Sequence, residues 1–223
     1  MKNYVFYCYD ILLLACFLTG CLFVRKSWPL EYKLLVVLSG LTLTVEATIQ
    51  LSFFLKTQPL SWLYNFFLPV ETGFIVYILY RASMHRAIKR LQAVLLISLP
   101  IGIGVSYSLH PIFFKLNEPI CIFFLFLELI SSCFFLVDAL LDRSDTPLTS
   151  RPLFWLTCGL LYFCSNYILM HAFISYMQLK KISENYYLLN SLITNACMYA
   201  GFLACFISLR PAKIRQRPSG SIA

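Results

Sequence analysis

The sequence predicts an all-α polytopic membrane protein, a bundle of seven transmembrane helices. Apolar residues make up 60% of the 223 residues and charged residues only 13%, and the mean hydropathy is +0.76. These values lie far from those of ordinary globular domains. Seven apolar stretches follow one another, each close to the ~20 residues that a helix needs to cross the hydrocarbon core of a bilayer. They span 4–24, 34–55, 62–80, 91–109, 119–141, 152–175 and 187–208.

The first stretch contains a motif that resembles a bacterial lipoprotein signal, because Leu18-Thr19-Gly20-Cys21 ends an apolar run in a small residue and a cysteine. A processed signal has a basic start and a polar region after the cut. Here Asp10 precedes the apolar run, and Phe23-Val24-Arg25-Lys26 follows the cysteine. We therefore expect an uncleaved first helix, whereas cleavage at Cys21 would leave six helices.

The second stretch has a polar stripe on one side. Ser39, Thr42, Glu46 and Gln50 are spaced so that they share one face of a helix. Polar groups at this depth must be satisfied within the protein, since lipid tails offer no hydrogen bonds. The stripe is therefore expected to face the bundle.

The third and fourth stretches each contain a proline. Pro69 cannot donate a hydrogen bond to the carbonyl oxygen of Asn65, so this helix should bend or carry a polar partner there. Pro100 has the same effect in the fourth stretch. The spacing of Ser98, Gly102 and Ser106 allows a close approach of neighbouring helices.

The last three stretches add further polar side chains. Glu128, Ser131 and Asp138 lie on one side of the fifth, with Asp138 near its inner end. In the sixth, Tyr162 and Asn166 share one face and Cys164, Tyr167 and His171 define another, and Asn195 lies at mid-depth in the seventh. Together with Glu46 and Glu71 these residues predict a polar, acidic interior.

The basic residues predict the orientation N-out, C-in. With the N-terminus outside, 13 of the 18 Lys and Arg residues fall on the cytoplasmic side, which is a firm positive-inside signal over short loops. These are Arg25, Lys26, Lys33, Arg81, Arg86, Lys89, Arg90, Arg143, Arg151, Arg210, Lys213, Arg215 and Arg217. Because the net charge of +8 comes from loops and tails that flank the spans, no nucleic-acid partner is expected.

The chain is predicted to consist of one transmembrane domain, 1–209, and a basic, disordered cytoplasmic tail, 210–223. Its basic residues are expected to contact anionic lipid, and they are Arg210, Lys213, Arg215 and Arg217. Between the spans the sequence leaves no room for a kinase, cyclase or nucleotide-binding module. A signalling output would therefore need a cytoplasmic or membrane partner protein.

No cofactor or metal ion is implied by the sequence. The nine cysteines all fall within apolar stretches, and no pair has the Cys-x-x-Cys spacing of a zinc or redox site. Buried cysteine behaves as a small hydrophobic residue. No catalytic residue is assigned either, because the chain has no P-loop, no GxGxxG and no HExxH motif.

Three buried carboxyl groups, those of Glu46, Glu71 and Glu128, lie near the middle of their spans without a Lys or Arg at that depth. Burial without an opposing charge disfavours the ionised form, so we expect them to be protonated at neutral pH. One interpretation is structural, with the carboxyl groups hydrogen-bonding to neighbouring helices. Glu71 in particular is expected to face the bundle interior and to contact a polar side chain of the second, sixth or seventh helix.

Short motifs resemble those of a family of seven-helix membrane proteins found in Bacteroidota-type bacteria. Trp62-Leu63-Tyr64-Asn65 followed by Glu71 is similar to the third helix of that family. Pro152-Leu153-Phe154-Trp155, leading into Gly159, Tyr162, Phe163 and Asn166, is similar to the sixth, and Asn190 to Asn195 to the seventh. The family has no assigned activity, so the resemblance implies a multi-pass protein of the bacterial inner membrane and singles out Glu71, Trp155, Tyr162 and Asn166.

The leading hypothesis from the sequence is a sensor-like or ligand-binding module that acts with a partner chain. Its candidate ligand-binding residues are Glu46, Gln50, Glu71, Glu128, Asn166, His171 and Asn195. Two alternatives stay open. One is a proton-coupled transporter of small molecules, in which Glu71 and Glu128 would carry the proton. The other is an intramembrane enzyme acting on a lipid or isoprenoid, which would need His171 at ~3 Å from a carboxylate or serine hydroxyl.

Overall fold

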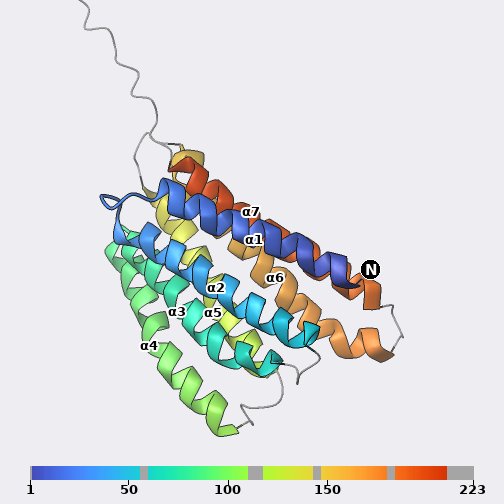
Figure 1. Ribbon diagram of the computed structural model, residues 1–223. Helices are drawn as coiled ribbons and strands as arrows, with labels where there is room; N and C mark the ends of the chain where they lie inside the picture. The colour runs from blue at the N-terminus through green and yellow to red at the C-terminus, as the bar shows by residue number, and fades with distance from the viewer. Residues whose placement is uncertain (1, 56–59, 110–117, 143–146, 180–183, 210–223) are drawn as a thin grey trace, which may run out of the picture.

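The computed structural model describes residues 2–55, 60–109, 118–142, 147–179 and 184–209 (Figure 1). Within these ranges the chain forms seven α-helices and no strand, so the all-α prediction is confirmed. The helices are α1 (Lys2–Phe23), α2 (Leu30–Phe54), α3 (Tyr64–Ala82), α4 (Arg86–Leu109), α5 (Glu118–Leu141), α6 (Pro152–Leu179) and α7 (Glu184–Ser208). Short 3-10 turns at Ser61–Leu63 and Leu148–Ser150 precede α3 and α6. The basic tail 210–223 and Arg143 lie outside the described residues.

Five of the seven helices, α2, α4, α5, α6 and α7, are long and apolar enough to cross a membrane. They make the chain a multi-pass membrane protein. In α1 the apolar described segment is shorter and covers Asp10–Phe23. Helix α3 has 19 residues and includes Asn65, Glu71 and Arg81, which lower its apolar character.

Six helices form a closed ring in the order α1, α2, α3, α5, α6, α7, because each contacts the next and α7 contacts α1. Helix α4 packs on the outside of this ring against α3 and α5. Gln92 on α4 and Ser131 on α5 join the two helices by a reciprocal pair of bonds. The Gln92 amide donates to the Ser131 carbonyl oxygen at 2.8 Å, and the Ser131 hydroxyl donates to the Gln92 side-chain oxygen at 2.6 Å.

The outer surface of the ring is apolar along much of its length. Large side chains that point outward include Ile11, Leu22, Val94, Ile97 and Leu140. A water-soluble protein would bury such residues, whereas lipid tails accommodate them.

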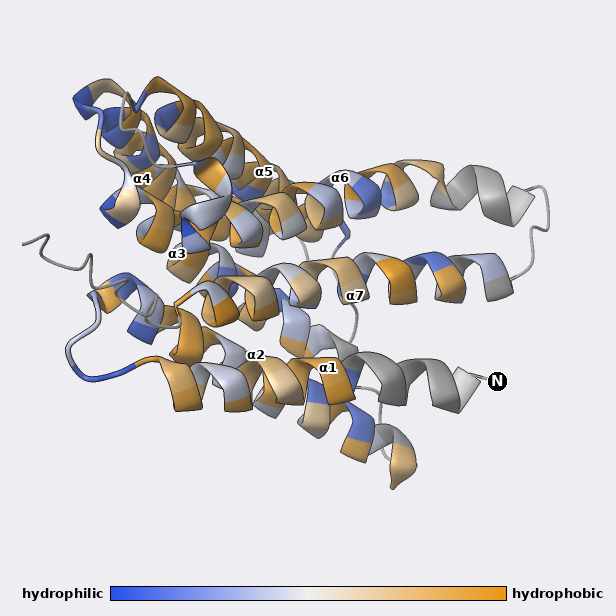
Figure 2. Ribbon diagram, turned by 90° about the horizontal axis from the view of Figure 1, so that it is seen from above, coloured by the Kyte–Doolittle hydropathy of each residue, from blue (hydrophilic) through white to orange (hydrophobic). Residues whose placement is uncertain are grey.

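The two ends of the bundle differ in charge. Basic residues cluster where α1 connects to α2, α3 to α4 and α5 to α6, which is also where α7 ends; we call this the basic end. Figure 2 shows hydrophilic segments gathered there. The described basic residues of these connections and adjoining turns are Arg25, Lys26, Lys33, Arg81, Arg86, Lys89, Arg90 and Arg151.

The interior of the ring is packed in the half that lies toward the basic end. A continuous cluster of buried apolar side chains from α1, α2, α3, α5, α6 and α7 packs there. Helices α6 and α7 approach each other very closely there, at Gly159 and Gly201. A Cβ atom placed on Gly201 would lie 2.7 Å from the backbone oxygen of Trp155 and 3.0 Å from the Cα of Gly159. Only glycine allows this distance between the two backbones.

Pro69 in α3 has the polar partner that the sequence predicts. The carbonyl oxygen of Asn65, which would accept from residue 69 in a regular helix, accepts a hydrogen bond from the Tyr107 hydroxyl of α4 at 2.8 Å. This bond ties the far end of α4 to the ring. Gly102 on α4 also allows close packing, since its Cβ would meet the ring of Phe123 on α5 at 2.2 Å.

Candidate binding cavity

A cavity of about 250 Å³ lies inside the ring, in the half away from the basic end. Five helices, α2, α3, α5, α6 and α7, contribute to its lining. The lining residues are Thr42, Glu46, Tyr64, Phe67, Leu68, Glu71, Cys121, Leu125, Phe163, Tyr167, His171, Ser191, Asn195, Met198 and Tyr199. Four of the seven candidate residues named from the sequence are among them: Glu46, Glu71, His171 and Asn195.

The wall formed by α2 carries the polar stripe. Ser39, Thr42 and Glu46 are all buried, which confirms for these three residues that the stripe faces the bundle, while Gln50, its fourth member, is half-buried. The hydroxyls of Ser39 and Thr42 donate to carbonyl oxygens one turn earlier in the same helix. Glu46 is held from the neighbouring helix, because the Tyr64 hydroxyl donates to its Oε1 at 2.7 Å.

Glu71 on α3 faces the interior, as predicted, and is 9% exposed. Within the described residues its carboxyl group takes part in no hydrogen bond or ion pair, so it is directed into the cavity without a partner. It is near enough to Glu128 on α5 and Glu46 on α2 for the three carboxyl groups to influence one another electrostatically. The polar side chain of α2 that acts on Glu71 is therefore Glu46, through its charge and not through a hydrogen bond.

The wall formed by α6 and α7 is polar and internally bonded. The hydroxyls of Tyr167 and Ser191 are 2.9 Å apart, and the Asn195 amide donates to the Tyr167 hydroxyl at 3.0 Å. The ring of His171 lies beside that of Tyr167, with centroids 6.2 Å apart. Its Nδ1 is buried and makes no hydrogen bond to a described residue.

Glu128 lies behind the cavity rather than in its lining. Its Oε1 accepts from the Thr72 hydroxyl of α3 at 2.7 Å, and its Oε2 from the Cys164 thiol of α6 at 3.6 Å. The side chain is 1% exposed. Glu128 thus joins α3, α5 and α6, which is the structural role that the sequence left open for these carboxyl groups.

Gln50 and Asn166, two further candidates from the sequence, also lie outside the cavity lining. Gln50 donates to a carboxylate oxygen of Asp10 and so links α2 to α1. The Asn166 amide donates to the carbonyl oxygen of Tyr162 in its own helix at 2.9 Å, on an exposed side of α6. Asn166 lies outside the cavity because of its position around the helix: it shares a face of α6 with Tyr162, whereas Tyr167 and His171 lie on another face, which lines the cavity.

Several lining residues were not among the sequence candidates, notably Tyr64, Tyr167 and Ser191. The signal for two of them was available. Tyr167 is four residues before His171, and Ser191 is four residues before Asn195, so each lies on the same helix face as a residue that was selected. Tyr64 is the first residue of α3, and only its position beside Glu46 of α2 shows its role.

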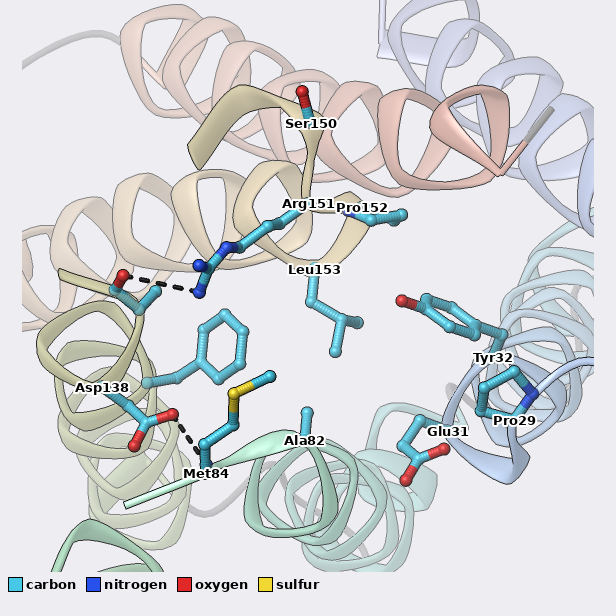
Figure 3. A pocket seen from close by; sticks show the side chains of 12 residues that line it. Pro29, Glu31, Tyr32, Ala82, Met84, Asp138, Ser150, Arg151, Pro152 and Leu153 are labelled. Atoms are coloured by element: carbon cyan, nitrogen blue, oxygen red, sulfur yellow. Dashed lines mark hydrogen bonds between the residues drawn. The ribbon is translucent and has the colours of Figure 1, made fainter. Parts of the chain in front are cut away.

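A second cavity of about 420 Å³ lies at the basic end and is shown in Figure 3. Glu31 and Tyr32 of α2 lie on one side of it, and Asp138 of α5 and Arg151 lie on the other. The guanidinium of Arg81 donates to Glu31 Oε1 at 3.1 Å. This hydrogen bond and the negative charge of Glu31 raise the pKa of Arg81.

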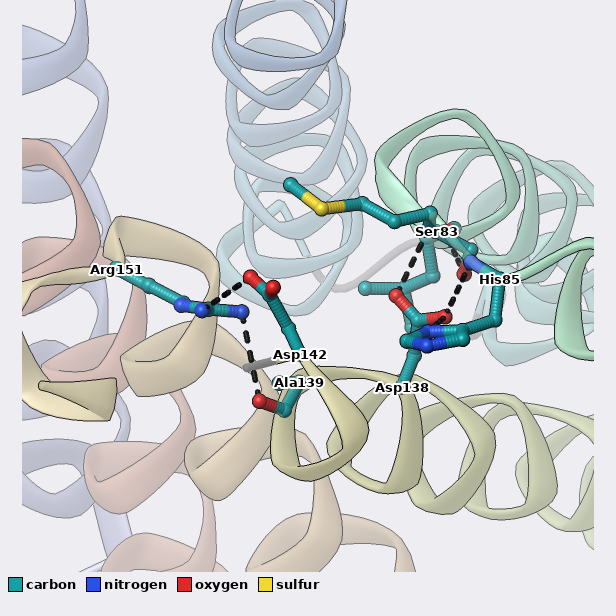
Figure 4. A network of polar contacts seen from close by, with 8 residues as sticks. Ser83, His85, Asp138, Ala139, Asp142 and Arg151 are labelled. Carbon is teal, nitrogen blue, oxygen red and sulfur yellow. Dashed lines mark hydrogen bonds and ion pairs between the residues drawn. The ribbon is translucent and has the colours of Figure 1, made fainter. Parts of the chain in front are cut away.

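The polar network beside this cavity joins the connections between helices (Figure 4). Asp138 accepts hydrogen bonds from the backbone N–H groups of Met84 and His85, each at 2.8 Å, just before α4 begins, and lies 3.0 Å from the imidazole Nδ1 of His85. Arg151, which precedes α6, pairs with Asp142 after α5 and donates to the carbonyl oxygen of Ala139. These groups satisfy one another and fix the helix ends, which is a structural role.

Within the described ranges, no group of three or more His, Cys, Asp or Glu side chains is arranged to hold a metal ion. No known protein family, curated protein or solved structure matches this chain. The groups available for binding or catalysis in the cavity are two carboxyl groups, an imidazole, amide and hydroxyl groups, and aromatic side chains.

Proposed function

We propose that the protein is a ligand-binding membrane module of sensor type, and that the cavity inside the helix ring holds a small ligand. The observation that carries the proposal is the cavity itself: about 250 Å³ lined by residues of five helices, with convergent polar groups in an otherwise apolar bundle. Concave sites that combine apolar walls with a few placed polar groups are the usual form of small-molecule sites.

The proposal includes seven membrane spans with the orientation N-out, C-in, in the inner membrane of a bacterium of the Bacteroidota type. The basic end then faces the cytoplasm, as the positive-inside rule requires, and the cavity lies in the outer half of the bundle. Helices α1 and α3 belong to the closed ring, and the ring stays intact in the membrane if these two helices span it together with the other five. The basic end and its tail would contact anionic lipid and a partner chain that carries the response.

Two features favour binding over the alternatives. A transporter needs a route through the bundle, but a cluster of buried apolar side chains from six helices packs inside the ring toward the basic end, where the second cavity opens. The enzyme hypothesis needs His171 beside a carboxylate or serine hydroxyl. The Nδ1 atom of His171 makes no such bond within the described residues.

Topology is tested by fusing a periplasmic reporter and a cytoplasmic reporter to residue 209. We expect only the cytoplasmic reporter to be active. Activity of the periplasmic reporter alone would overturn the proposed orientation.

Binding is tested with the purified protein in lipid nanodiscs against a panel of small cations, anions and neutral molecules, by the shift in melting temperature. We expect at least one compound to stabilise the protein, and Ser191→Phe, which fills the cavity, to abolish that shift. Ala200→Phe, at an exposed position of the same helix outside the cavity lining, is the matched control and should keep the shift. A compound that stabilises the Ser191→Phe protein equally well would show that it binds elsewhere.

A further inference from the structure

The carboxyl group of Glu71 is, beside the Nδ1 atom of His171, a polar group of the cavity lining that has no hydrogen-bond partner among the described residues. It is 9% exposed, points into the cavity and makes no hydrogen bond or ion pair to any described residue. Burying a polar group without a partner is costly, so native proteins rarely leave one unpaired. Glu71 is therefore positioned for a partner that is not part of the polypeptide.

The charges around Glu71 define that partner. A second carboxyl group, that of Glu46, lines the same cavity and accepts a hydrogen bond from the Tyr64 hydroxyl. The described lining contains no Lys or Arg to balance the two acids. Glu128 behind the wall adds a third acidic group that acts on Glu71. When at least one of these carboxyl groups is ionised, the site attracts a positive charge and repels an anion.

Aromatic side chains form much of the remaining wall. Tyr64, Phe67, Phe163, Tyr167 and Tyr199 all line the cavity. The face of an aromatic ring attracts a cation, and this attraction is strongest where water is excluded. Aromatic walls also receive the apolar part of a ligand, which a simple hydrated inorganic ion does not have.

Size and geometry narrow the ligand further. The cavity of about 250 Å³ is smaller than the roughly 300–1,000 Å³ of sites for drug-sized ligands. In the described part of the chain no three His, Cys, Asp or Glu side chains come together as metal ligands, which argues against a coordinated divalent ion. An organic cation needs no such cluster, because one or two carboxylates and aromatic faces suffice.

We propose that the ligand is a small organic cation, an ammonium compound with an apolar body, whose charge is bound by Glu71 and Glu46 while the aromatic wall contacts the rest. This inference rests on the proposed binding function of the cavity. Binding requires at least one of the two carboxyl groups to be ionised, and the cation supplies a positive charge that the described lining of the cavity does not contain. The ammonium group could belong to a free metabolite or to a lipid headgroup, and the experiment distinguishes these sources.

The test compares pairs of compounds that differ in charge but hardly in shape. Choline is paired with 3,3-dimethyl-1-butanol, and 2-phenylethylamine with 2-phenylethanol. The whole chain is placed in phosphatidylglycerol nanodiscs, whose lipids contain no ammonium group, and binding is measured by calorimetric titration. We expect one or both cations to bind and the neutral partners to bind at least tenfold more weakly.

Variants locate the binding. Glu71→Gln and Glu46→Gln each remove one acid while keeping the size of the side chain and its ability to form hydrogen bonds. Each should weaken the binding of the cation by at least tenfold. Glu31→Gln removes one acid at the basic end, outside this cavity, and should leave the affinity unchanged. It also controls for attraction of cations to the anionic nanodisc. Circular dichroism and melting curves of all three variants show that each is folded.

The source of the ammonium group is tested by replacing half of the lipid with phosphatidylethanolamine. If the group belongs to a free compound, the titration with choline or 2-phenylethylamine should be unaffected. If it belongs to a lipid, phosphatidylethanolamine should raise the melting temperature of the wild type but not of Glu71→Gln, and should compete with the free cations.

The outcomes separate this inference from the proposed function. If neutral or anionic compounds of the wider panel bind and Ser191→Phe abolishes their binding, the cavity is a binding site but the ligand is not a cation. If the cations bind equally to wild type and to Glu71→Gln and Glu46→Gln, the assignment of the two acids is overturned. If no compound of any charge binds, both proposals fail.

Discussion

The two halves of the helix ring are built from the same six helices but differ in what fills them. Toward the basic end, leucine, isoleucine and phenylalanine side chains close the interior, with Phe206 completely buried. In the other half the same ring encloses a cavity with Glu46 and Glu71 in its wall. The comparison indicates that the half of the ring toward the basic end contributes most to stability, whereas the other half provides the binding site. Substitutions in the first half should act on folding, and substitutions in the second on binding.

The largest effect is expected from Phe206→Ala in the packed half. Removing a fully buried aromatic side chain leaves a void that rigid helices cannot close, and should lower the free energy of unfolding by about 3–5 kcal/mol. Phe173→Ala, at a side chain that is 55% exposed, is the control and should lower it far less. Reversible unfolding in SDS-containing mixed micelles measures both. Equal losses for the two variants would show that the packed half is not the stable one.

A smaller loss is expected from Gly201→Ala, which tests the contact between α6 and α7. The new Cβ would lie 2.7 Å from a backbone oxygen, so the helices must separate, at a cost of about 1–3 kcal/mol in the free energy of unfolding. Gly104→Ala is the matched control, because a Cβ there has no atom within 4 Å. The same unfolding measurement applies. An unchanged Gly201→Ala protein would contradict the close approach of these backbones.

Tyr107→Phe should have a still smaller effect, about 1 kcal/mol in the free energy of unfolding. It removes the hydroxyl that donates to the carbonyl oxygen of Asn65, to which Pro69 cannot donate. Ser108→Ala, whose hydroxyl is exposed and bonds only within its own helix, should change stability less. The proposed role of Tyr107 fails if Tyr107→Phe and Ser108→Ala unfold alike.

The smallest effect on folding is expected in the hollow half. Glu71→Gln removes no hydrogen bond to a described residue, so the free energy of unfolding should change by less than about 1 kcal/mol. Glu128→Gln is the comparison, since Glu128 bonds Thr72 and Cys164, and should be the more destabilising of the two. If Glu71→Gln lowered the free energy of unfolding more than Glu128→Gln, Glu71 would have a structural role, and the proposed difference between the two halves of the ring would be wrong.

The candidate site was only partly predictable from the sequence. Spacing within one helix placed Glu46 on the interior face of α2 and separated the Asn166 face of α6 from the His171 face, because helical phase is a local property. It could not distinguish Glu71 from Glu128. Both are buried acids at mid-span, yet one faces a cavity and the other bonds Thr72 and Cys164 on neighbouring helices.

By itself the sequence determined that the chain is helical, which stretches form the helices, and that the acids face inward. Those outcomes follow from the length of each apolar stretch and from the cost of an unsatisfied polar group in lipid. Only the tertiary structure decided that α4 lies outside a ring of six helices and that the cavity with Glu46 and Glu71 lies on the side of the buried apolar cluster away from the basic end. The physical reason is that both depend on which helices meet, through contacts such as Gly159 with Gly201 and Tyr107 with Asn65, and the periodicity of a single helix carries no information about its neighbours.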